Sequence, residues 1–110
     1  MGMGIGINVH SPDAGKIKGH QEPVACGVWY TSTGTAIPKM IKFQDADGHI
    51  RTLSNLHVRT FEKKNYCGIP TLEYECDAVV NSRKYIFHLL YYVEHQKWTV
   101  LWKSQSFFNG

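Results

Sequence analysis

The sequence predicts a single all-β domain, a partly open antiparallel β-barrel or strongly bent sheet of six to seven strands, from three observations. Within residues 72–80, Glu73, Glu75 and Asp77 alternate with Leu72, Tyr74, Cys76, Ala78 and Val80, a period of two that is typical of a half-buried strand. Residues 84–94 and 98–102 are two further apolar segments, each preceded by a short polar break that can turn the chain. No ten-residue window combines helical spacing of apolar residues with capping residues, so we expect no long helix.

Three earlier strands are expected at residues 24–31, 36–44 and 49–53. Pro23 stands at the start of the first, and Pro38 lies near the start of the second, where the missing N–H costs least. Asp47-Gly48 separates the second from the third, and Asp-Gly between alternating apolar runs is a strong hairpin signal. The chain between these strands and the later ones is expected to hold a strand or short turn at 56–61, a solvated charge run at 62–65 and an irregular connection at 66–70.

The expected core consists of the inward positions of these strands, namely Val28, Ile41, Phe43, Tyr74, Cys76, Phe87, Leu89 and Trp98. The sequence has three cysteines, an odd number, with no Cys-x-x-Cys spacing. A disulfide framework needs an even number and zinc sites usually show close pairs. We therefore expect reduced thiols in a cytoplasmic protein, with Cys26 and Cys76 as small buried residues.

The 110 residues divide by composition into a flexible glycine-rich arm at 1–22, a β domain at 23–103 and a tail at 104–110. Ile5, Ile7 and Val9 alternate with small or polar residues, so the arm could add a short strand to a sheet edge. The sequence contains no run of about 18 apolar residues, so we expect no membrane span, and no secretory signal is evident.

The chain resembles small uncharacterised bacterial β-proteins in four motifs, which are Pro38-x-x-Ile41-x-Phe43, Asp47-Gly48-x-Ile50, Glu73-Tyr74-x-Cys76 and Trp98-x-x-x-Trp102. Those proteins carry a P-x-x-I-x-W-x-D-G-R-x-Y pattern, a later R-Y-x-C strand and a closing R-W-F-V strand. The resemblance covers about residues 36–103, with Phe43 where Trp is usual and two extra residues before Gly48. It implies the all-β fold, and because the family has no established activity it implies nothing about function.

No residue pattern predicts catalysis, a metal or a cofactor. The six histidines and three cysteines show no ligand-spaced pair. Asp45-x-Asp47-Gly48 could open a calcium loop, but loop position twelve, where a bidentate Glu belongs, is Leu56. Glu73 and Glu75 share a strand face and are expected to be solvated outer-face carboxylates. We therefore predict a protein that is not an enzyme.

Residues 84–94 are apolar on both faces, which an antiparallel sheet with one wet side does not require. The second face could be covered by the N-terminal arm, by Phe107-Phe108, by a barrel-closing strand or by another chain. We predict that Ile86, His88, Leu90 and Tyr92 form an association surface for a second copy or a protein partner. The predicted function is that of a non-catalytic binding or accessory module.

The alternative function is weak binding of single-stranded nucleic acid by a small β-barrel, which uses exposed aromatic and basic side chains. The candidate contacts are Trp29, Arg51, Arg59, Arg83 and Lys84. The net charge of +3 and the pI of about 8.8 are only mildly basic and fall short of a strong nucleic-acid footprint.

Overall fold

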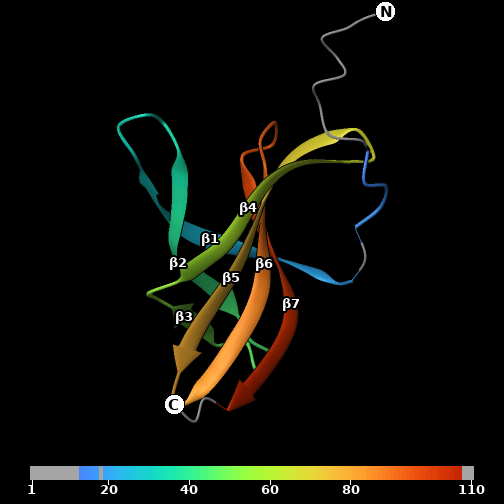
Figure 1. The fold of residues 1–110 in the computed structure, drawn as a ribbon. Helices are drawn as coiled ribbons and strands as arrows, with labels where there is room; N and C mark the ends of the chain where they lie inside the picture. The colour runs from blue at the N-terminus through green and yellow to red at the C-terminus, as the bar shows by residue number, and fades with distance from the viewer. Residues whose placement is uncertain (1–12, 18, 108–110) are drawn as a thin grey trace, which may run out of the picture.

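The computed structural model is all-β and confirms the predicted fold class (Figure 1). It describes residues 13–17 and 19–107. The seven strands are β1 (Gln21–Tyr30), β2 (Ala36–Gln44), β3 (Ile50–Leu53), β4 (His57–Tyr66), β5 (Ile69–Val80), β6 (Arg83–Tyr92) and β7 (Lys97–Phe107). They form one antiparallel sheet in the order β3-β2-β1-β7-β6-β5-β4, which curls into a half-barrel. Within the described residues no helix is long and apolar enough to cross a membrane.

Strand β1 carries the sheet around a corner. Its first part, Gln21–Val24, pairs with β7, whereas its second part, from Ala25 to Tyr30, pairs with β2. The β1–β2 hairpin therefore leaves the main sheet and extends beyond it, as Figure 1 shows. Across the opening of the half-barrel, Leu56 N donates to Lys39 O over 3.2 Å, and Tyr74 Oη on β5 donates to Ala36 O on β2 over 2.8 Å. These two bonds hold the ends of the curled sheet toward each other.

The core fills the concave side of the sheet. Its buried members are Ile41, Leu53, Leu56, Tyr74, Cys76, Ala78, Phe87, Leu89 and Val100. Seven of the eight predicted core residues belong to this cluster or pack against it, including Phe43 and Trp98 at its margin. The alternation of β5 and β6 places these side chains inward, since successive strand residues point to opposite faces. Cys76 is completely buried, Cys26 packs against the cluster, and burial raises the pKa of each thiol to about 12.

Val28 was expected in the core, and this prediction is wrong. The β1–β2 register shifts between Gly27 and Val28, and β1 has already separated from β7 at that point. Among the described residues, the end of β1 therefore belongs to a two-stranded ribbon with no third strand beside it. Trp29 and Tyr30 at its tip are 66% and 67% exposed.

The chain between 62 and 70 also differs from expectation. The predicted charge run is the second half of β4, and the predicted irregular connection is a tight hairpin turn at Cys67-Gly68. Both turn residues have positive φ, 51° and 79°, which matches the right-handed twist of the flanking strands. Asn81 and Ser82, at the predicted turn between β5 and β6, likewise both have positive φ. The four consecutive polar residues at 62–65 belong to this strand, although their composition alone indicated a loop.

The strands of the β domain extend beyond its predicted boundaries at both ends. Strand β1 begins at Gln21, inside the expected arm, and β7 continues to Phe107, inside the expected tail. Asp13 forms a parallel bridge with Asn65, and Gly68 N donates to its carboxylate over 2.8 Å. The expected strand at Ile5, Ile7 and Val9 lies outside the described residues.

Candidate functional site: a cleft beside an edge strand

The opening of the half-barrel forms a cleft of about 800 Å³ between β4 and the β1–β2 hairpin, here called the edge cleft. Its lining residues are Tyr30, Thr33, Gly34, Thr35, Ala36, Phe61, Lys63, Lys64, Asn65, Pro70, Thr71, Leu72, Tyr74, Tyr91 and Val93. Figure 1 shows β4 and the hairpin diverging toward the top of the view. The hairpin diverges because β1 pairs with β7 only along its first four residues.

Aromatic side chains form the floor of the edge cleft. The ring centroids of Phe61 and Tyr74 are 4.9 Å apart, those of Tyr74 and Trp98 are 5.7 Å apart, and those of Tyr91 and Trp98 are 4.7 Å apart. Burial raises the pKa of Tyr74 to about 12, so its hydroxyl stays protonated and donates to Ala36 O. The floor is thus a fixed apolar platform, with Phe61 42% exposed at the side of β4.

The rim of the edge cleft includes a strand edge. β4 is the last strand of the sheet, with β5 on one side. On its other side the Asn65 carbonyl accepts a hydrogen bond from Ala14 N over 2.7 Å. The backbone groups of alternate residues point to the same side of a strand, so Phe61 also directs its N–H and C=O away from β5. Apart from the bridge at Asn65, the described residues place no strand along that side.

A second cleft of about 780 Å³ opens near the far end of the half-barrel, next to β3 and the β5–β6 turn. Phe43, Tyr85 and Trp102 provide its aromatic surface, with the rings of Phe43 and Trp102 5.1 Å apart. Arg51 lies in its lining and donates through Nε to Asp45 over 2.7 Å. This guanidinium is therefore held by a carboxylate rather than directed at a ligand.

Glu73 lies on the convex face and is only 7% exposed, so the expectation of a solvated carboxylate there is wrong. Tyr66 Oη and His88 Nδ1 donate to its two oxygens, and Lys64 Nζ lies 3.4 Å from one of them. Burial alone would raise the pKa of Glu73, but the hydrogen bonds from Tyr66 and His88 outweigh burial and hold it below its ordinary value. The same burial and the bond to Glu73 raise the pKa of Tyr66.

Glu73→Gln should lower the free energy of unfolding at pH 7 by about 1–3 kcal/mol, because charge-assisted bonds to three partners are lost. A carboxyl whose folded pKa is lowered stabilises the fold above its unfolded pKa of about 4.3, and this stabilisation disappears as the pH falls through the folded pKa. Urea unfolding should therefore show a smaller difference in the free energy of unfolding between Glu73→Gln and the original chain at pH 3 than at pH 7. Glu75→Gln, whose carboxylate accepts from Thr60 Oγ1 over 3.2 Å, is the matched control and should cost less. An equal difference in the free energy of unfolding at both pH values would contradict the lowered pKa of Glu73.

The predicted association residues lie on the convex face of β6 but do not form one exposed surface. Leu90 is completely buried within the chain, and His88 is bonded to Glu73, while Ile86, His88 and Tyr92 are half-buried. The hydroxyl of Tyr92 donates to Gln21 Oε1, which also accepts from Thr99 Oγ1. Leu90 is therefore not exposed for association in the single chain. Association through Ile86 and its neighbours stays a prediction.

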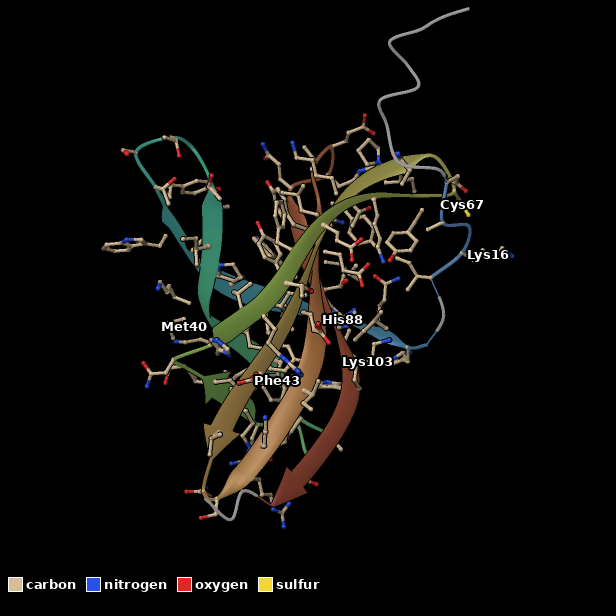
Figure 2. The ribbon with its side chains drawn as sticks, in the orientation of Figure 1. Lys16, Met40, Phe43, Cys67, His88 and Lys103 are labelled. Atoms are coloured by element: carbon tan, nitrogen blue, oxygen red, sulfur yellow. The ribbon has the colours of Figure 1, made fainter. Side chains whose placement is uncertain are left out.

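Part of the predicted arm contacts this convex face. Of the described residues before β1, which are 13–17 and 19–20, Asp13 and Ala14 are bound to the β4–β5 hairpin through Gly68 and Asn65. At the other end of this segment Gly19 lies against Leu101, where an added Cβ would be 3.3 Å from Cδ2. Figure 2 shows Lys16 on the far side of this segment, away from the sheet. One of the expected covers of the second apolar face, the N-terminal arm, is thus present in the described residues.

The five candidate nucleic-acid contacts do not meet at one place. Trp29 lies on β1, Arg51 on β3, Arg59 on β4, and Arg83 and Lys84 at the start of β6. Arg51 is paired with Asp45, and Arg59 Nε lies 3.8 Å from the carboxylate of Asp77. The edge cleft contains none of the five.

The β2–β3 turn brings Asp45, Asp47 and His49 within metal-ligating distance of one another, but its geometry is that of the predicted hairpin. Asp45 Oδ1 accepts from the backbone N–H of Asp47 and of His49, and Arg51 occupies Oδ2. These bonds hold the pKa of Asp45 below its ordinary value. The carboxylate is thus used by the turn itself.

Phe61 and Lys63 on the rim of the edge cleft were not predicted as site residues, because residues 56–61 were interpreted as a strand or short turn and residues 62–65 as a solvated charge run. Comparison with known proteins finds no matching family model, no matching curated protein and no matching solved structure. The resemblance to small bacterial β-proteins stays a prediction. The edge cleft, with its aromatic floor and its strand rim, is therefore the best-defined candidate site of this chain.

Proposed function

We propose that this protein is a non-catalytic binding module that associates with a protein partner by taking an extended segment of that partner into the edge cleft. One observation carries the proposal: an edge strand, β4, directs backbone groups at Phe61 away from β5, beside an aromatic-floored cleft. Recognition by strand addition uses main-chain hydrogen bonds for affinity and pockets for alternate side chains for specificity. The edge cleft offers both elements side by side.

The half-barrel supports this mode of binding in two further ways. The hydrogen bonds from Tyr74 to Ala36 and from Leu56 to Lys39 fix the distance between the two ends of the curled sheet. The edge cleft beside these bonds is therefore already open. A segment can therefore enter without a rearrangement of the core, which would cost affinity. Its inward side chains would meet Phe61, Tyr74 and Tyr91, and aromatic residues of this kind are enriched where partners bind.

The test is selection of binders from a random twelve-residue peptide library by the immobilised full chain. We expect enriched peptides with apolar residues at every second position, since a strand presents one face to the cleft. Methylation of alternate backbone nitrogens in such a peptide should abolish binding, because each methyl group removes a donor. Phe61→Ala should weaken binding at least tenfold, which corresponds to about 1.4 kcal/mol.

Ile50→Ala is the matched control, since Ile50 is 67% exposed on β3 and does not line the edge cleft. It should leave peptide affinity unchanged. The proposal fails if no peptide is enriched, or if the enriched peptides bind the Phe61→Ala chain as tightly as the original. Binding of a labelled oligothymidylate at 50 mM salt with a steep salt dependence would instead favour the nucleic-acid alternative.

A further inference from the structure

We infer that the second cleft, next to β3 and the β5–β6 turn, binds a small planar aromatic ligand that carries one anionic group, such as an aromatic carboxylate or sulfonate. This site is separate from the proposed function, because the second cleft shares no lining residue with the edge cleft. Its volume of about 780 Å³ lies within the range of about 300–1,000 Å³ that is typical of small-molecule sites. Such sites combine an apolar lining with a few polar groups that orient the ligand.

Three aromatic rings from three strands form the walls of the second cleft. The ring of Trp102 on β7 is inclined by 65° to that of Phe43 on β2 and by 63° to that of Tyr85 on β6, with centroid distances of 5.1 and 6.1 Å. All three side chains are half-buried, so each ring packs against the core and still borders the cleft. Aromatic pairs prefer offset-stacked or edge-to-face arrangements, and steeply inclined walls offer a flat ligand both. The walls therefore favour an aromatic ligand.

Strand pairing and hydrogen bonding fix these walls before a ligand arrives. Trp102 pairs with the completely buried Phe87 on β6, and its Nε1 donates to Glu22 Oε1 on β1 over 2.8 Å. Phe43 pairs with Arg51 on β3, and directly opposite residues share a face of the sheet. A ligand can therefore enter without first ordering the side chains that receive it, which would cost affinity.

Three charged side chains line the second cleft, namely Asp45, Arg51 and Lys103. Asp45 and Arg51 are paired over 2.7 Å, so their charges balance. Within the described residues Lys103 has no ion pair, and the rest of the sequence contains no Asp or Glu. Lys103 and Phe43, labelled in Figure 2, line the cleft from β7 and β2. The cleft thus carries one positive charge without a counter-charge, which favours an anionic ligand.

The same charges disfavour a quaternary ammonium ligand, which aromatic cages bind in other proteins. Asp45 is the one carboxylate that the described residues place in the lining. Its Oδ1 accepts from two backbone N–H groups of the β2–β3 turn, and its Oδ2 accepts from Arg51. A cationic ligand would therefore meet Arg51 and Lys103 without a free carboxylate to compensate their repulsion.

The test follows the indole N–H signals of the isotope-labelled full chain by NMR while three naphthalene probes are added separately: the carboxylate, the neutral carboxamide and the trimethylammonium compound. The chain has three tryptophans. Trp29 lies at the tip of the β1–β2 hairpin and Trp98 lies beneath the edge cleft, so the Trp102 signal should respond to binding in the second cleft. The carboxylate should bind about fivefold more tightly than the carboxamide, as expected of one partly exposed ion pair. The trimethylammonium compound should bind more weakly than both.

Lys103→Gln should lower the affinity for the carboxylate to that for the carboxamide and leave the carboxamide affinity unchanged. Lys42→Gln, the matched control on β2 and outside both clefts, should leave the preference for the carboxylate intact. The inference is wrong if no probe shifts the Trp102 signal, or if the Trp29 or Trp98 signal responds with the same affinity. It is equally wrong if the trimethylammonium compound binds as tightly as the carboxylate, or if Lys103→Gln retains the preference.

Discussion

Phe87→Ala should lower the free energy of unfolding by about 3–5 kcal/mol, the largest effect expected of a single truncation in this chain. Phe87 is completely buried at the centre of the concave face. It pairs with Cys76 on β5 and Trp102 on β7, and its ring centroid lies 5.3 Å from that of Trp102. Its loss would leave a cavity bordered by strands on both sides, which the curled sheet cannot close without breaking its register. Urea unfolding followed by tryptophan fluorescence measures this loss.

Val79→Ala is the control for this experiment. Val79 lies on β5, adjacent to the Phe87 strand, but its side chain is 47% exposed. Surface truncations usually change stability by no more than about 0.5 kcal/mol. A loss below 1 kcal/mol for Phe87→Ala, or equal losses for the two variants, would contradict the assignment of the concave face as the main core.

The concave core was predictable because period-two alternation is a local property of the sequence. Tyr74, Cys76 and Phe87 fall on one face by counting alone, and the structure places all three in the core. The error at Val28 has a non-local cause. Alternation does not reveal that β1 changes its neighbour from β7 to β2, or that the register shifts beside it. The burial of a side chain at a strand end depends on the neighbouring strands, and the pairing of those strands is a property of the whole sheet.

The edge cleft was missed for a related reason. An edge strand with water on one side has little need of apolar residues, so the second half of β4 shows four polar residues in a row. The signal that could have identified it is the turn. Tyr66-Cys67-Gly68-Ile69 contains a two-residue X-Gly break between apolar residues, which favours a tight hairpin and therefore a strand on each side of it.

The packing of the convex face was also predicted only in part. Both faces of β6 were recognised as apolar, and the need for a cover was correctly inferred. The cover is a combination that no local pattern encodes: Asp13 at the β4–β5 hairpin, Gly19 against Leu101, and a carboxylate at Glu73 held by hydrogen bonds. Buried polar groups keep their place only when their partners are positioned, and these partners come from β4 and β6. The convex side is thus a second, smaller packed region.

Leu90→Ala should therefore destabilise the single chain by about 2–5 kcal/mol, as expected of a buried leucine. Leu90 is completely buried, as is Leu89 beside it on the opposite face of β6, so the two positions test the two faces of one strand. Because the cover comes from the same chain, the loss should be the same at every protein concentration. Ile86→Ala, a half-buried position on the same face, is the control and should cost less. Chemical unfolding at two protein concentrations a hundredfold apart, with sedimentation of each sample, decides the question. A loss that grows with concentration, together with a dimer that Leu90→Ala dissociates, would restore the association surface and overturn the intramolecular cover.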